Sequence, residues 1–262
     1  PLTKQQTKVL TGRATLAYEI PYLDIYGKPT EFTRVKYLED VRPFGSKKNV
    51  RYWQPNDTLP QLYYPPVLLW KEIVKNTDIP ICITEGEKKA AKACIEGIPT
   101  IALGGVWSWR SKKKGVPLIA DFYDIEMEGR VIEMVFDSDL NTNPDVLRAL
   151  IAISRELTKL GAIITVVKLP DKKGKVGLDD YVLQRSKEQF LKLPREEYEV
   201  SHMLWGLNEE LALIENPASY LHIPTGQLFK SSAQLCETIY GDRIHSELSI
   251  DSKGSESFKE VN

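Results

Sequence analysis

The feature that most constrains the fold of this sequence is an alternation of short apolar runs and helix-forming segments that begins at residue 79. Residues 79–84 (IPICIT) and 99–105 (PTIALGG) are short runs with β-branched residues, which is typical of buried strands. Between them, EKKAAKACIEG has helix formers throughout and ends at a glycine, which predicts a helix. A strand, a helix and a second strand in this order favour a parallel sheet, because such a connection brings the chain back in the same direction.

The alternation continues to residue 170. RVIEMVFDSD (130–139) predicts a third strand and AIITVVKLP (162–170) a fourth. Between them, Asn143 and Pro144 are a typical helix cap and first helical residue, and the segment that follows has apolar residues at spacings of three and four. The predicted fold class is therefore α/β, with a mostly parallel sheet and helices on both of its faces.

The flanking segments have a different character. Residues 1–14 are polar, and we expect them to be loosely ordered. Residues 16–38 have β-rich, partly alternating segments around a Tyr-Gly-Lys-Pro turn, which predicts a hairpin. We therefore predict three parts: a β-rich N-terminal subdomain over residues 1–76, the α/β domain over residues 77–194, and a mixed C-terminal segment over residues 195–262.

The composition limits the classes of function that need to be considered. The net charge is −1 in 262 residues, so a nucleic-acid surface would have to be a local patch. The three cysteines and three histidines never form CxxC or HxxxH spacing, so no zinc site is predicted. The odd cysteine count fits a reducing, cytoplasmic setting. No apolar run approaches the roughly 18–20 residues that span a bilayer, so we predict no membrane partner. The chain begins with proline and ends in a polar tail, as a piece of a longer protein would.

Acidic residues follow three of the four predicted strands. Glu85 comes directly after the first strand, Asp137 and Asp139 close the third, and Asp179 and Asp180 come shortly after the fourth. An isolated Asp-x-Asp is most often part of a turn or a helix cap. In an open parallel sheet, however, the carboxyl ends of the strands meet at one edge. Carboxylate oxygens without His or Cys suit Mg²⁺ or Mn²⁺, so the combination predicts a metal centre for one of these ions.

A site that handles phosphate also needs cations. Lys88 and Lys89 lie one turn beyond Glu85, and Lys88 is the stronger candidate. Other basic residues follow Trp107 and Trp109, whose rings could stack on bases while the cations follow the backbone. The alternatives are that this lysine run is only a solvated loop and that the tryptophans serve the core. The candidate nucleotide- and DNA-binding residues are Lys88, Lys89, Arg34, Lys36, Lys47, Lys48, Arg51, Arg110, Lys112, Lys113 and Lys114.

The segments ITEGEKKAAKACIEGIPTIALGG, VIEMVFDSD and GLDDY together resemble the Toprim domain, which bacterial-type primases, type IA and II topoisomerases and some nucleases share. TEGEKKA followed by GLDDY is similar to Toprim-like domains of phage and plasmid primase–helicases. GKPTEFTRVKY, VRYWQP and LYYPP resemble the segment that precedes the domain in those proteins. The resemblance implies that Glu85, Asp137 and Asp139 are catalytic and hold metal, with Asp179 or Asp180 as a further ligand.

The function implied by this resemblance is that of a DNA primase. Such an enzyme is a Mg²⁺- or Mn²⁺-dependent nucleotidyltransferase that makes primers from nucleoside triphosphates on single-stranded DNA, here in the cytoplasm of a bacterial cell or phage-infected host. A helicase in the same or another chain is the implied partner, and residues 195–262 would be the link to it. The sequence has no zinc module and no Walker A loop, so these residues do not encode zinc-based template recognition or ATP-driven unwinding. Two alternatives remain open: a metal-dependent Toprim nuclease, and a non-catalytic module that binds nucleic acid.

Overall fold

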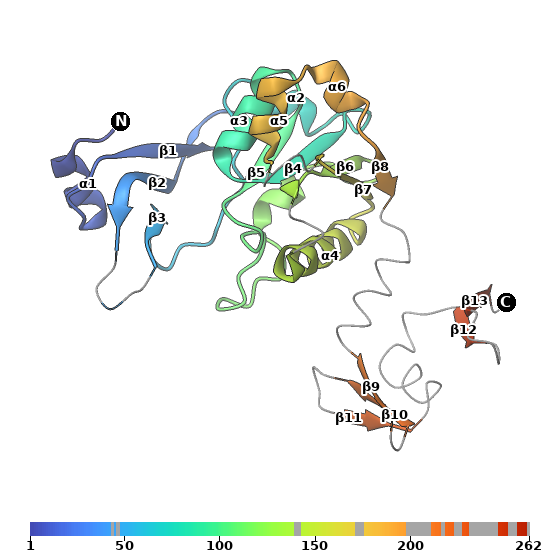
Figure 1. Cartoon of the computed structure of the whole chain (residues 1–262). Helices are drawn as coiled ribbons and strands as arrows, with labels where there is room; N and C mark the ends of the chain where they lie inside the picture. Colours follow the sequence, from blue (N-terminus) through green and yellow to red (C-terminus); the bar gives the residue numbers. More distant parts are fainter. Residues whose placement is uncertain are drawn as a thin grey trace. The chain divides into compact units, whose positions relative to one another are not determined.

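The structure is a computed structural model of the chain. It describes residues 1–42, 45, 48–138, 143–170, 176–197, 211–215, 218–222, 227–230, 246–250 and 256–260. The chain divides into two compact units, Pro1–Tyr198 and Glu199–Asn262. The first unit holds a three-stranded antiparallel sheet and a five-stranded, mostly parallel sheet (Figure 1).

The N-terminal sheet is formed by β1 (Ala17–Leu23), β2 (Pro29–Val41) and β3 (Val50–Trp53), all antiparallel, so the predicted hairpin is confirmed. The expectation of loose order before residue 15 is wrong, because Lys4–Thr11 forms helix α1. A capping box explains the helix: the Thr3 hydroxyl accepts a hydrogen bond from the Gln6 backbone, and the Gln6 side chain accepts one from the Thr3 backbone. Gly12, at φ 74°, ends the helix in the left-handed region.

The larger sheet has the strand order β5-β4-β6-β7-β8. Its four parallel strands are the predicted ones: β4 (Ile81–Glu85), β5 (Thr100–Leu103), β6 (Val131–Met134) and β7 (Ile163–Val167). The short strand β8 (Arg195–Glu197) pairs with β7 in the antiparallel direction. The helices are α2 (Trp70–Ile73), α3 (Glu87–Ile95), α4 (Pro144–Thr158), α5 (Leu178–Gln184) and α6 (Lys187–Leu191), with a 3₁₀ turn, η1, at Ala120–Asp124.

Two apolar clusters cover the two faces of this sheet. On one face, strand residues such as Ile83 and Met134 pack with α4, for example at Leu150. On the other, Cys82 and Val135 pack against residues of α3, α5 and α6. Successive strand residues point to opposite faces, which explains why near-continuous apolar runs form these strands. The predicted α/β fold class, with helices on both faces, is confirmed (Figure 1).

Helix α4 begins as predicted. The Asn143 side chain accepts a hydrogen bond from the Asp145 backbone at 3.2 Å, and Pro144 is the first helical residue. The helix ends at Thr158, three residues before Gly161, which has a φ of 85°. The cap and the proline are therefore reliable signals for this helix.

The α/β core also uses residues outside the predicted range of 77–194. Leu62, Tyr64 and Trp70 belong to its larger apolar cluster. Tyr63 forms an antiparallel β-bridge with Ala102 of β5. At the other end, β8 extends the sheet beyond residue 194. The division at residues 76 and 194 stays a prediction.

The second unit has two small antiparallel sheets. One is formed by β9 (Leu211–Glu215), β10 (Ala218–His222) and β11 (Gln227–Phe229), and the other by β12 (Ser246–Ile250) and β13 (Glu256–Glu260). Within the described parts of the chain, no helix is both long enough and apolar enough to pass through a membrane.

Candidate active site

Two of the predicted acids lie at the carboxyl edge of the sheet, on neighbouring strands. Glu85 is the last residue of β4, and Asp137 follows β6 by three residues. The Val135 backbone still donates to Ile83 of β4 at 2.8 Å, so the two strands run side by side almost to the acids. Gly86, with a φ of 90°, allows the sharp turn from β4 into α3. The strand order therefore brings Glu85 and Asp137 to one place, as the alternation predicted.

The ammonium group of Lys89 lies between these two carboxylates. Its Nζ atom donates to Oδ1 of Asp137 and lies 3.7 Å from Oε1 of Glu85. The Lys89 side chain is 18% exposed and that of Asp137 only 5%. Lys89 was predicted to bind phosphate, but here it acts as a counter-ion to the acids.

The segment that leads into α5 completes this corner. Val176 and Ser138 hydrogen-bond each other twice, through the Ser138 backbone at 3.0 Å and the Ser138 hydroxyl at 2.9 Å. A Cβ atom on Gly177 would lie 3.3 Å from Oδ1 of Asp137 and 2.8 Å from Oδ1 of Asp179. Asp180 instead accepts a hydrogen bond from the Gly177 backbone at 3.3 Å and so caps α5. Asp179 and Asp137 thus border the same side of Gly177, whereas Asp180 serves as the helix cap.

The fit of this corner to a metal ion can be judged from its donors. Asp139 lies outside the described residues. In the described ranges, no group of three or more His, Cys, Asp and Glu side chains is arranged to hold a metal. The chemistry nevertheless fits a hard cation, because the donors are carboxylate oxygens and a positive charge already lies between two of them. The described carboxylates of this corner, on Glu85, Asp137 and Asp179, offer oxygen donors of the kind that Mg²⁺ and Mn²⁺ prefer.

A second glutamate of the same motif, Glu87, is buried and received no role from the sequence. Its Oε1 atom accepts hydrogen bonds from the Tyr22 hydroxyl at 2.8 Å and from Nη1 of Arg34. Burial, and then the charge of Glu87, raise the pKa of Tyr22 well above its usual range. The network joins β1 and β2 of the N-terminal sheet to α3. The sequence alone hardly predicts this network, because Arg34 precedes Glu87 by 53 residues.

Arg34 was predicted to bind phosphate, and the structure places it in this buried network. Its guanidinium group lies 4.6 Å from the centre of the Tyr52 ring and against the backbone of Gly104, where an added Cβ would lie 2.8 Å from Nη1. The Arg34 side chain is only 9% exposed. In this arrangement Arg34 links the N-terminal sheet to α3.

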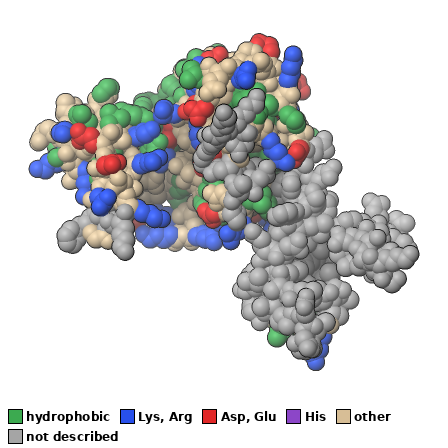
Figure 2. All heavy atoms as spheres, viewed as in Figure 1, with side chains coloured by type: hydrophobic (Ala, Val, Ile, Leu, Met, Phe, Trp, Pro, Cys, Tyr) green, Lys and Arg blue, Asp and Glu red, His purple; other side chains and the backbone are tan. Residues whose placement is uncertain are grey.

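Other predicted cations gather around Tyr52. The Lys36 ammonium lies 5.5 Å from the centre of the Tyr52 ring and 5.9 Å from that of Tyr18. Lys36, Arg51 and Tyr52 also line a pocket between β2 and β3. Burial, followed by the charge of Glu87, raises the pKa of Tyr52, while Arg34, Lys88 and Lys89 oppose the rise. Figure 2 shows Lys and Arg side chains on the face where the N-terminal sheet meets the larger sheet.

The remaining candidates have mixed placements. Lys88 is exposed on the first turn of α3, and Lys48 is exposed before β3, whereas Lys47 lies outside the described residues. Lys113 pairs with the Asp57 carboxylate at 2.9 Å, and Lys114 donates to the Asp57 backbone carbonyl. These two lysines therefore tie their loop to the segment around residue 57.

Arg110 stacks on both tryptophans of its loop. Its guanidinium carbon lies 4.1 Å from the Trp107 ring centre and 4.7 Å from that of Trp109. Trp109 is fully buried and belongs to the larger apolar cluster, so it serves the core. Arg110 and Lys112 line a pocket beside Glu156 of α4. This pocket is a basic, partly aromatic surface built around Arg110.

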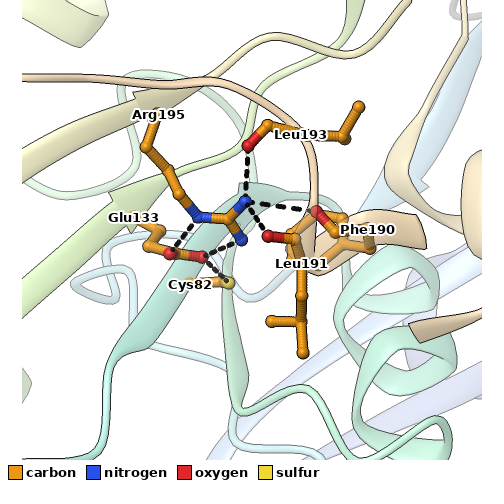
Figure 3. Close-up of polar contacts among 6 residues, drawn as sticks. All are labelled: Cys82, Glu133, Phe190, Leu191, Leu193 and Arg195. Carbon is orange, nitrogen blue, oxygen red and sulfur yellow. Dashed lines mark hydrogen bonds and ion pairs between the residues drawn. The ribbon is translucent and has the colours of Figure 1, made fainter. Parts of the chain in front are cut away.

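A further cation–carboxylate pair lies on the α3 face of the sheet (Figure 3). Nε of Arg195 donates to Glu133 Oε1 at 2.8 Å, and Nη1 donates to the carbonyls of Phe190, Leu191 and Leu193 at 2.7–3.2 Å. The Cys82 thiol donates to Glu133 Oε2 at 3.3 Å, and burial, followed by Glu133, raises the pKa of that thiol. The cluster attaches β8 and the end of α6 to the sheet.

The comparisons with known proteins agree with this fold. A family model described as "Domain of unknown function (DUF3854)" matches residues 69–189. None of the curated proteins matches the sequence. Among solved structures, the chain is similar to the E. coli primase catalytic core, with 16% identity, a TM-score of 0.50, and 86% of this chain aligned to 62% of that one. It is also similar to a DNA primase domain from Pseudomonas aeruginosa, with 18% identity, a TM-score of 0.51, and 74% of this chain aligned to 56% of that one.

These likenesses define the fold class of the chain. It has the fold of primase catalytic domains and spans less than two thirds of the length of those two structures. At 16% and 18% identity, the likeness concerns the fold and leaves the chemistry to the residues of the site.

Proposed function

We propose that this chain is a primase-type nucleotidyltransferase domain that makes oligonucleotides on single-stranded DNA. The observation that carries the proposal is the approach of Glu85 and Asp137 to one cation position at the carboxyl edge of a primase-like sheet. That edge is where the active groups of open α/β sheets collect.

In this proposal, the described acids Glu85, Asp137 and Asp179, together with Asp139, hold Mg²⁺ or Mn²⁺. A divalent ion bound there supplies charge neutralisation for the transferring phosphoryl group. The carboxylates would hold the ion, and Asp180 caps the start of α5, next to Asp179. Lys88, exposed on the first turn of α3, binds the phosphates of an incoming nucleoside triphosphate.

Single-stranded DNA is proposed to lie on the tyrosine- and lysine-containing face around Tyr52. Lys36 and Arg51 would contact phosphates there, and the rings of Tyr18 and Tyr52 would offer surfaces for bases. The surface around Arg110 and Lys112 is the second candidate for the same strand. Arg34 contributes by holding this face against α3.

The wider setting is part of the same proposal. A replication protein of a phage, plasmid or other mobile element in a bacterial cytoplasm fits the TEGEKKA and GLDDY motifs. In such a protein, residues 195–262 would lead toward a helicase in the same or another chain.

The test is template-dependent synthesis with labelled nucleoside triphosphates, single-stranded DNA and Mg²⁺ or Mn²⁺. The protein would be assayed as wild type, as Asp137→Asn, and as Asp78→Asn. Asp78 is an exposed aspartate three residues before β4, at the amino edge of the same sheet, and is a matched control for charge. New oligonucleotides from wild type and Asp78→Asn, but not from Asp137→Asn, are the expected result.

Two other results would replace this function with one of its alternatives. Metal-dependent shortening of the template, lost in Asp137→Asn, would identify a nuclease. Binding of single-stranded DNA that persists in Asp137→Asn, with neither synthesis nor cleavage by wild type, would identify a non-catalytic module.

A further inference from the structure

Lys89 occupies the position that a metal ion would be expected to take between the acids. Its Nζ atom contacts Asp137 and lies 3.7 Å from Glu85. Glu85 ends β4 and Lys89 lies on the first turns of α3, and the sharp turn at Gly86 brings the two side chains together. Strand order supplies the second carboxylate, since β6 pairs directly with β4.

The backbone around Lys89 makes room for this placement. Gly177 lies beside the lysine stem, and a Cβ atom there would be 2.9 Å from Cε of Lys89. The same Cβ would approach both Asp137 and Asp179. The absence of a side chain at position 177 therefore lets one ammonium group reach the corner where the carboxylates meet.

We propose that the Lys89 ammonium is a resident counter-ion that competes with a divalent cation for Asp137. The inference rests on the proposed function and specifies how its metal site is controlled. Two cations in contact with one carboxylate repel each other, so a divalent ion at Asp137 weakens the contact with Lys89 or displaces it. Lysine suits this exchange because its single ammonium group sits on a flexible stem and is readily hydrated once released. Lys89 lowers the affinity for metal and holds the acids together when no metal is bound.

The first test measures Mn²⁺ binding to the full chain by electron paramagnetic resonance, which reports free Mn²⁺. Wild type would be compared with Lys89→Met, which keeps the stem and removes the charge, and with Lys89→Arg, which keeps the charge. Lys88→Met is the matched control, since it removes an exposed charge from the neighbouring position. Lys89→Met is expected to bind Mn²⁺ about 10-fold more tightly than wild type, as removal of a competing adjacent charge implies. Lys88→Met and Lys89→Arg should stay within about 3-fold of wild type.

The second test is the thermal midpoint in EDTA and in Mn²⁺. Without metal, Lys89→Met should melt below wild type, because the nearly buried Asp137 loses its ion pair with the Lys89 ammonium. Adding Mn²⁺ should raise the midpoint of Lys89→Met more than that of wild type. Lys88→Met should follow wild type in both conditions.

A third measurement uses wild type alone and covers the case in which Lys89→Met does not fold. The ¹H–¹⁵N signal of an ammonium group held in an ion pair is visible by NMR, and Lys89→Arg identifies it by removing it. Mg²⁺ should weaken or shift this signal at the same concentrations at which calorimetry detects binding. Binding of Mg²⁺ without any change in the Lys89 signal would overturn the proposal.

The outcomes separate this inference from the proposed function. Equal Mn²⁺ affinity in wild type, Lys89→Met and Lys88→Met would overturn the competition by Lys89 and leave a metal-dependent primase intact. No Mn²⁺ binding by any of the variants at millimolar concentration would overturn both.

Discussion

Glu85 and Glu87 stand two residues apart in the same strand-to-helix turn, yet they meet different kinds of cation. Glu85, 24% exposed, shares the ammonium of Lys89 with Asp137. Glu87, 3% exposed, accepts hydrogen bonds from the guanidinium of Arg34 and the hydroxyl of Tyr22. One carboxylate thus borders solvent beside a flexible amine, and the other is enclosed by rigid donors.

The kind of cation beside each carboxylate indicates which acids could bind a metal ion in place of their present partner. A guanidinium group presents its hydrogen-bond donors in a fixed plane, and the pairs Glu87–Arg34 and Glu133–Arg195 both use it. These pairs join elements: the N-terminal sheet to α3 in one case, and β8 to the sheet in the other. A lysine with one close contact at a partly open edge can be exchanged for another cation, and this is the arrangement at Asp137.

The largest expected effect is a loss of stability when the buried Arg34–Glu87 pair is broken. Arg34→Met should lower the free energy of unfolding by about 3–5 kcal/mol, because it leaves Glu87 as an uncompensated buried charge. Urea unfolding followed by circular dichroism measures this loss. The double variant Arg34→Met/Glu87→Met should recover much of it, since both charges are then gone.

Lys36→Met is the matched control for Arg34→Met. Lys36 lies on the same face of β2, also beside Tyr52, but is more exposed than Arg34. Its loss should cost less than about 1 kcal/mol. If Arg34→Met lowers the free energy of unfolding no more than Lys36→Met does, the Arg34–Glu87 pair is not a structural ion pair, and the contrast with the exchangeable Lys89–Asp137 pair is lost.

The next effect separates the two glutamates by activity. Glu85→Gln should reduce template-dependent synthesis at least as much as the loss of an outer partner of a metal ligand, whose upper range is about 100-fold. The unfolding free energy should change little. Glu87→Gln should do the opposite: it should lower stability while the activity per folded molecule stays within about 3-fold of wild type. Equal loss of synthesis in both variants at matched folded concentration would contradict the assignment of separate roles.

A smaller effect is expected at the second guanidinium pair, shown in Figure 3. Arg195→Met removes hydrogen bonds to Glu133 and to three carbonyls near the end of α6, and should cost about 2–3 kcal/mol. Amide hydrogen exchange should then speed up in β8 and α6 before the rest of the sheet. Lys168→Met is the control, because Lys168 pairs with Glu196 of β8 at 2.7 Å but is 43% exposed, and its loss should cost less than about 1 kcal/mol.

Much of the α/β core is predictable from local patterns. Apolar runs locate β4 to β7, and the Asn143–Pro144 cap locates α4. Chain direction then implies that acids after these strands share an edge, so the sequence alone is enough to bring Glu85 and Asp137 together. The capping box at Thr3 and Gln6 could also have revealed α1, because its spacing is visible in the sequence.

The remaining features depend on distant partners and have no local signal. Arg34 looks like an exposed cation on a hairpin until packing brings it to Glu87, 53 residues away. β8 has the sequence REE, without apolar alternation, and is held by pairing to β7 and by Glu133, 62 residues from Arg195. The contact of Lys89 with Glu85 depends on the turn at Gly86, and its contact with Asp137 requires the strand order.

The smallest effects concern two glycines that each adjoin one of the contrasted cations. A Cβ at Gly104 would lie 2.8 Å from Nη1 of Arg34, and a Cβ at Gly177 would lie 2.9 Å from Cε of Lys89. Arg34 cannot move without breaking its bond to Glu87, so Gly104→Ala should cost about 1–3 kcal/mol. At Gly177 the crowding atoms include the ends of Lys89 and Asp179, which can swing toward solvent, and the backbone φ of −91° suits alanine.

Gly177→Ala should therefore change the unfolding free energy by less than about 1 kcal/mol, since the lower entropy of the unfolded chain offsets the crowding. Because it pushes the lysine stem away from Asp137, it should also tighten Mn²⁺ binding, in the same direction as Lys89→Met but by less. Gly104→Ala should leave Mn²⁺ affinity unchanged. If Gly177→Ala costs as much stability as Gly104→Ala, then Lys89 is held as firmly as Arg34. The Lys89–Asp137 pair would then be a structural ion pair like Arg34–Glu87, and would not exchange its cation for a metal.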